Sequence, residues 1–195
     1  AAASYRQAIT LIPNYAEAHY NLGLALQGLG SLDEAEVSFN QAIALNPGFA
    51  EAHNNLGILL QELERSDDAE ASYKRAIALK SDYAEAHYNL GITLQELGRL
   101  DEAEAGFRQA IALKSDYPDA HSNLGNTLQE LGRLDEAGAS YKQAIALKPD
   151  YAKVHNNLGV TLKELGRLDE AEASHAKAIA LKPDYAKAHN NLGVT

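Results

Sequence analysis

Apolar residues recur along the chain with the spacing of amphipathic helices. Leu90 and Leu94 lie four residues apart and form one apolar stripe. Ala103 and Phe107 continue this spacing in the segment that follows. Between the two segments lies Gly98, a residue type that suits the left-handed conformation closing a helix. The pattern therefore predicts two helices joined by a short turn.

This helix pair recurs with a fixed period of 34 residues. Glycine follows the apolar leucine of each first helix at Gly23, Gly57, Gly91, Gly125, Gly159 and Gly193. The period predicts a half repeat at 1–15 that holds only a second helix, full repeats at 16–49, 50–83, 84–117, 118–151 and 152–185, and a partial first helix at 186–195. We therefore expect residues 1–195 to form a single array, and number the positions 1 to 34 within each repeat.

Local signals refine the two helices of a repeat. Asp82 followed by Glu85 predicts a capping box for a first helix, and Asp101 followed by Glu104 predicts one for a second helix. Glycine at position 8 costs about 1 kcal/mol in a helix relative to alanine. We expect close approach of the second helix, with alanine at position 20 facing the glycine, to offset this cost. Large side chains at position 24 would fill the remaining space.

Composition narrows the classes of function. Hydrophobic residues make up 46% and charged residues 23%, as in globular proteins. Acidic residues number 27 against 17 basic ones, which argues against binding to nucleic acid or to an anionic membrane. No apolar run approaches a transmembrane length, so we expect a soluble protein. A cytoplasmic location is favoured, although cysteine-free chains occur in every compartment. Since residue 1 is not methionine, we expect the chain to be part of a longer protein.

Several fixed positions of the repeat resemble one known family. Each repeat has leucine at position 7, glycine at position 8 and alanine at positions 20 and 27, mostly an aromatic residue at position 24 and often proline at position 32. Over its whole length the chain is similar to the tetratricopeptide repeat family. The resemblance implies an all-α fold, a right-handed superhelical solenoid of antiparallel helix pairs whose first helices line a concave groove. Histidine at position 4 and leucine at position 11 depart from the family pattern.

Asparagine at position 6 is the main candidate for binding. The family geometry places this position in the groove, and an amide can both donate to and accept from a peptide backbone. The arrangement resembles the tetratricopeptide region of O-linked N-acetylglucosamine transferases, where groove asparagines hold extended polypeptide. The candidate residues are Asn21, Asn55, Asn89, Asn123, Asn157 and Asn191, with Tyr20 and Tyr88 at position 5, Asn126 at position 9, and Gln61, Gln95 and Gln129 at position 12. The alternative is that the asparagines bond a neighbouring helix or recur through duplication alone.

Charged residues bear on which polypeptide would bind. Glutamate at position 13 makes one side of the groove acidic, which favours ligands with neutral or basic side chains. Position 5 is never lysine and position 6 is never arginine, so the carboxylate clamp of some tetratricopeptide co-chaperones is incomplete. Position 2 changes from acidic residues to Lys153 and Lys187 along the chain. We interpret these as helix-start residues, although they could orient a ligand.

Six histidines occupy position 4, at His19, His53, His87, His121, His155 and His189. Equivalent atoms on successive repeats would lie too far apart to share one metal ion, so we expect partly buried imidazoles and no metal. His175, at position 24, could approach His155 or His189. The sequence has no phosphate loop or nucleophile elbow, so we expect no cofactor and no enzymatic activity.

We therefore expect a protein interaction module that binds a protein or peptide in extended conformation. One alternative is the substrate-recruiting region of a larger enzyme, such as a glycosyltransferase. Another is a self-assembling scaffold, because the partial repeats at the two ends could stack head to tail.

Overall fold

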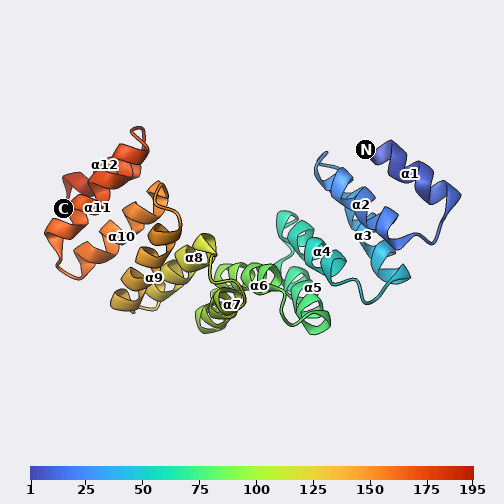
Figure 1. Ribbon diagram of the computed structural model, residues 1–195, viewed down its shortest axis with the longest axis horizontal. Coiled ribbons are helices and arrows are strands. Elements are labelled where there is room, and N and C mark those ends of the chain that lie inside the picture. Colours follow the sequence, from blue (N-terminus) through green and yellow to red (C-terminus); the bar gives the residue numbers. More distant parts are fainter. The chain divides into compact units, whose positions relative to one another are not determined.

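The computed structural model describes all residues from 1 to 195, as twelve α-helices without any strand (Figure 1). This confirms the all-α prediction. The chain forms two compact parts, Ala1–Thr93 and Leu94–Thr195, called the first and second halves below. The helices are α1 (Ala2–Leu11), α2 (Ala16–Gln27), α3 (Leu32–Leu45), α4 (Ala50–Glu62), α5 (Ser66–Leu79), α6 (Ala84–Glu96), α7 (Leu100–Leu113), α8 (Pro118–Glu130), α9 (Leu134–Leu147), α10 (Ala152–Glu164), α11 (Leu168–Leu181) and α12 (Ala186–Gly193).

Within each half, consecutive helices pack against one another. The helix pairs α2–α3 and α4–α5 form the most extensive contacts of the first half, and α8–α9 and α10–α11 those of the second. Each pair also contacts the next, through α3 and α4 in the first half and through α9 and α10 in the second. This is the packing of a helical solenoid, as the repeat pattern predicts. None of the twelve helices combines the length and the apolar character that crossing a membrane requires.

The turn inside a repeat closes as its glycine predicts. Gly98 has φ +73°, and its backbone N–H donates to Gln95 O over 2.9 Å. The N–H of Arg99 reaches back to Leu94 O at 2.8 Å. These two bonds form the Schellman motif that ends a helix at a left-handed residue. The one equivalent residue that is not glycine, Glu64, also has a positive φ, of 58°.

The predicted capping boxes are wrong. Helix α7 begins at Leu100, so Asp101 lies inside its first turn and Arg99 is the N-cap residue, without a side-chain cap bond. Asp82 lies two residues before α6 begins. The acidic residues of the first turn instead favour the helix start through the dipole and through ion pairs. Arg99 Nη2, for example, lies 2.6 Å from Glu102 Oε2.

The glycine at position 8 faces an aromatic ring. A Cβ atom on Gly57 would lie 2.6 Å from the ring of Tyr73, and one on Gly125 would lie 2.5 Å from the ring of Tyr141. Alanine at position 20 is fully buried, but the ring at position 24 is what the glycine accommodates. The expected close approach is therefore confirmed, and its expected partner is corrected from position 20 to position 24.

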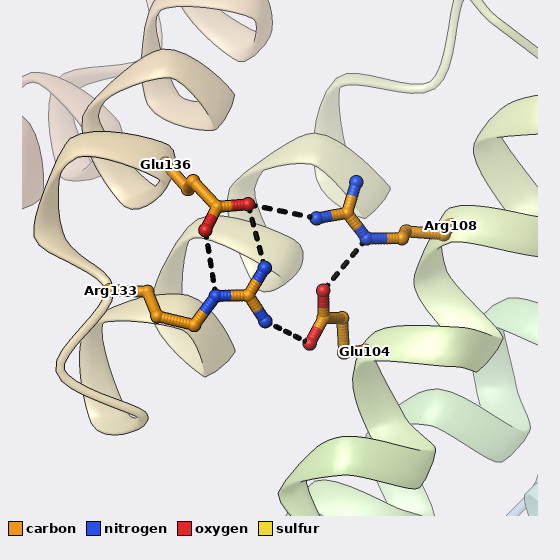
Figure 2. Close-up of polar contacts among 4 residues, drawn as sticks. All are labelled: Glu104, Arg108, Arg133 and Glu136. Atoms are coloured by element: carbon orange, nitrogen blue, oxygen red, sulfur yellow. Dashed lines mark hydrogen bonds and ion pairs between the residues drawn. The ribbon is translucent and has the colours of Figure 1, made fainter.

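Ion pairs join second helices of neighbouring repeats (Figure 2). In the second half, Glu104 of α7 accepts from Arg133 Nη1 at 2.6 Å and from Arg108 Nε at 2.8 Å. Arg133 and Arg108 also contact Glu136, at 2.7 and 3.3 Å. The four residues thus connect α7 to the start of α9. Hydrogen bonds from Arg133 above all lower the pKa of Glu136.

Candidate functional site

A pocket of the second half lies on its first helices. It has a volume of about 600 Å³, and its walls come only from α6, α8, α10 and α12. The lining residues are Gln95, Asn126, Gln129, Glu130, Asn157, Val160, Glu164, Lys187 and Asn191. The structure therefore brings together five of the candidate residues, namely Gln95, Asn126, Gln129, Asn157 and Asn191.

The asparagines at position 6 hydrogen-bond to the preceding first helix. Asn191 Nδ2 donates to Asn156 Oδ1 over 3.0 Å, and Asn89 Nδ2 donates to Asn54 Oδ1 over 3.1 Å. The acceptors Asn54 and Asn156 are buried, whereas Asn89 and Asn191 are half-buried. The bond to a neighbouring helix, considered above as the alternative role, is therefore present. It uses one N–H of each amide and holds the side chain in place.

The remaining position-6 asparagines have other hydrogen-bond partners or positions. Asn55 Nδ2 donates to Tyr20 Oη at 2.7 Å, and its Oδ1 accepts from Asn54. Asn157 Nδ2 donates to Asn126 Oδ1 at 3.0 Å. Asn123 Oδ1 accepts from Asn126 Nδ2, while Asn21 lies half-buried on α2.

Tyrosine at position 24 reaches this surface through its hydroxyl. The ring of Tyr141 is fully buried, yet its Oη lies 2.8 Å from Asn126 Oδ1 and 3.1 Å from Gln129 Oε1. Burial, together with the charge of Glu130, raises the pKa of Tyr141. The hydroxyl therefore stays protonated and donates. In the first half, Tyr73 Oη donates to Gln61 in the same way.

From the sequence, position 24 is expected only to fill the core, so this contact of its hydroxyl was not predicted. Tyrosine in place of phenylalanine was the available signal, because a buried phenol needs a hydrogen-bond partner.

The glutamines at position 12 bridge to the following repeat. Gln95 Nε2 donates to Glu130 Oε1 at 2.6 Å, and Gln129 Nε2 donates to Glu164 Oε1 at 3.4 Å. Each bond joins residues 35 apart in the sequence. The amides and carboxylates of the surface thus form an ordered polar row.

The two candidate tyrosines lie half-buried on their helices, Tyr20 on α2 and Tyr88 on α6. The ring of Tyr20 packs against that of Phe49, with centroids 4.8 Å apart. Burial raises the pKa of Tyr20, with a further contribution from the charge of Glu51. Its phenol is therefore neutral at physiological pH.

Most histidines at position 4 form a hydrogen bond to a backbone carbonyl of the loop before their own helix. His19 Nε2 lies 3.0 Å from Pro13 O, and His155 Nε2 lies 3.0 Å from Pro149 O. A carbonyl oxygen only accepts, so Nε2 carries the proton in this bond. His87, His121 and His189 make the same bond to the residue six positions earlier. No three histidine or acidic side chains are grouped so that they could hold a metal ion.

His175 differs from the other histidines. It is fully buried at position 24, and neither of its ring nitrogens has a hydrogen-bond partner. Burial, and then the charge of Lys163, lower its pKa. His155 and His189 bond the carbonyls of Pro149 and Pro183, and neither forms a hydrogen bond with His175.

Comparisons with known proteins place the chain in a family. Models described as tetratricopeptide repeat match residues 48–116 and residues 16–49 and 152–185, and one described as TPR repeat matches 1–30 and 125–166. No curated protein matches the chain significantly.

Several solved structures are similar over most of their length. PilW, a widely conserved type IV pilus biogenesis factor, is 27% identical with a TM-score of 0.84, over 97% of this chain and 88% of its own. MamA is 27% identical with a TM-score of 0.79, over 85% and 97%. YrrB, a TPR protein with an unusual peptide-binding site, is 24% identical with a TM-score of 0.82, over 97% and 98%. The chain therefore belongs to the tetratricopeptide repeat family, and its fold is that of a protein–protein interaction module.

Proposed function

We propose that this chain binds extended polypeptide along the amide-lined surface of its first helices. The observation that carries the proposal is the pocket of about 600 Å³ in the second half, where asparagine and glutamine side chains from successive repeats converge. The structural neighbour YrrB has an unusual peptide-binding site, so the fold can carry such a site.

The amides suit a peptide backbone. A side-chain amide offers two N–H donors and a carbonyl acceptor, the same groups that a peptide bond presents. Asn89 and Asn191 each donate one N–H to a buried neighbour, which leaves the second N–H and the side-chain carbonyl for a ligand. Because the bond to the neighbour fixes the side chain in advance, little rotamer entropy would be lost on binding.

The spacing of the helices suits an extended chain. Packed helices lie about 8–10 Å apart, and an extended chain advances about 3.3 Å per residue. One asparagine would therefore meet about every third ligand residue, and recognition would rest mainly on the backbone. Glu130 and Glu164 line the same pocket. Glu130 favours neutral or basic ligand side chains beside it, whereas the charge of Lys163 offsets that of Glu164. We further propose that the module is not itself an enzyme, since most of the lining side chains are amides, which neither titrate nor act as nucleophiles at neutral pH.

A matched pair of variants tests the proposal. The first variant changes Asn89 and Asn191 to alanine, and the control changes Asn54 and Asn156 to alanine. Each removes the same two interhelix hydrogen bonds, and the control also removes the bond from Asn54 to Asn55. Only the first variant changes side chains that lie half-buried at the surface. Both are compared with the unaltered chain for capture of a random library of extended peptides, and urea unfolding measures the stability of all three.

We expect the Asn89→Ala, Asn191→Ala variant to capture far less peptide than the control at equal stability. Equal capture by the two variants would show that the asparagines serve only the packing of the helices.

A further inference from the structure

The last full repeat departs from the others at two positions that meet in space. Position 24 holds His175, where Tyr73 and Tyr141 stand in two other repeats, and position 12 holds Lys163 in place of glutamine. In those two repeats the phenol donates to the glutamine. The imidazole has no hydroxyl, and lysine cannot accept a hydrogen bond. The contact that closes the surface in those two repeats is therefore missing here.

A pocket of about 340 Å³ lies at this place. It is lined by Val160, Lys163, Glu164, His175 and Asn191. His175 is fully buried within it, and both its ring nitrogens lack a partner. A buried polar group without a hydrogen bond is costly, so native proteins rarely keep one without a function or a bound molecule.

The lining is rich in hydrogen-bond donors. Lys163 Nζ donates to Val194 O at 2.6 Å and retains two further N–H groups. Asn191 spends one N–H on Asn156, and the neutral imidazole of His175 supplies another donor. The charged groups that line the pocket beside His175 are Lys163 and Glu164, both from α10, while α12 adds the neutral Asn191. Glu164 is exposed at the rim, where solvent screens its negative charge, and it accepts a hydrogen bond from Gln129.

We propose that this pocket holds the carboxylate side chain of an aspartate or glutamate in the bound polypeptide. Lys163 would supply the opposite charge, and His175 and Asn191 would supply further hydrogen bonds. The inference rests on the proposed function, because it assigns one side chain of the extended ligand. It uses positions 6, 12 and 24, and therefore differs from the position-5 lysine clamp that the sequence lacks.

Carboxylate binding would be linked to a proton. Burial and the charge of Lys163 lower the pKa of His175, so the ring is neutral at pH 7 in the free protein. A carboxylate beside the ring favours the imidazolium, which raises this pKa. Binding therefore takes up a proton, and affinity for an acidic ligand increases as the pH falls from about 8 to about 6.

The test compares the unaltered chain with the double variant His175→Tyr, Lys163→Gln. This variant installs the pair already present as Tyr141 and Gln129, so the fold has a precedent within the same chain. Both proteins capture the random peptide library at pH 6 and at pH 8. We expect aspartate or glutamate to be enriched about tenfold at one ligand position by the unaltered chain, as for a charge-assisted hydrogen bond. The enrichment should be greater at pH 6 and absent in the variant, which still captures peptides.

Two other results separate this inference from the proposed function. Capture without acidic enrichment, or with the same enrichment in the variant, overturns the carboxylate pocket and leaves peptide binding intact. If neither protein captures peptide, the proposed function fails, and NMR titration of the His175 ring with a blocked glutamate decides the pocket alone. A raised pKa that a blocked glutamine does not produce supports it, and equal values overturn it.

Discussion

A Cβ atom added to Gly57 would lie 2.6 Å from Cε1 of Tyr73, whose ring is fully buried between the helices of its repeat. Residue 57 must be glycine because the Tyr73 ring occupies the space that any larger side chain there would need. The same relationship recurs between Gly23 and Phe39, where the distance is 2.7 Å.

Gly57→Ala should therefore destabilise the protein, although alanine is the better helix former. The helix gain is about 1 kcal/mol, whereas overpacking a core costs about 1–3 kcal/mol. We expect a net loss of up to about 2 kcal/mol, measured as a lower urea midpoint. Gly193→Ala is the control, since a Cβ there meets nothing within 4 Å. A Gly57→Ala variant more stable than the parent would refute the role assigned to the ring.

Glu64→Gly should stabilise the protein. Glu64 has φ +58° at the turn where Gly30, Gly98, Gly132 and Gly166 stand in the other repeats. A left-handed conformation costs a residue with a Cβ about 1–2 kcal/mol, so we expect a gain of about 1 kcal/mol in thermal or urea unfolding. The reciprocal change Gly98→Ala should lose a similar amount, even though a Cβ there would lie in open space. An unchanged midpoint for both variants would argue against strain at this turn.

Stability should fall on mild acidification. Burial lowers the pKa of His53 and of His175, and the charge of Lys163 lowers that of His175 further. The unfolded chain titrates near pH 6.5, so just below that pH it binds more protons than the folded chain and unfolding is favoured. We expect the urea midpoint to drop as the pH falls from about 7.5 through about 6.5, and to level off below the folded values.

His175→Tyr serves as the control and should make this decline shallower. Ion-paired carboxylates affect stability only at lower pH, because hydrogen bonds from Arg133 and Arg167 lower the pKa of Glu136 and Glu170 below 4.5. A midpoint that is flat between pH 8 and pH 5.5 would exclude the histidine contribution.

Arg133→Gln should weaken the connection between neighbouring repeats in a salt-dependent way. Arg133 bridges Glu104 of α7 and Glu136 of α9 (Figure 2). Arg167, at the equivalent position, forms its ion pair with Glu170 of α11. Salt screens exposed pairs more than it screens Glu104, whose side chain is only 13% exposed. We expect a lower urea midpoint for Arg133→Gln at low salt, a smaller difference in 1 M NaCl, and a lesser effect for Arg167→Gln. Equal effects of the two substitutions would show that the bridge to α7 contributes nothing.

The elements of the fold follow from interactions between residues close in sequence. Leucine and alanine spacing predicts the helices, and glycine at position 15 predicts a turn in which Gly98 is left-handed, as observed. The capping boxes failed because α7 starts at Leu100, one residue before the expected cap, Asp101. A shift of one residue changes which side chain can reach the free N–H groups, and local composition cannot resolve such a shift.

The sequence by itself determined the helices, the turns, the 34-residue period and the family, because each depends on contacts within a few residues or on a motif repeated many times. The tertiary structure alone decided what the polar side chains do. Asn191 and Asn156 are 35 residues apart, and their hydrogen bond depends on how two helices are rotated against each other. The sequence likewise shows His175 and Lys163, but only the packing shows that they line one pocket and that the His175 ring has no hydrogen-bond partner.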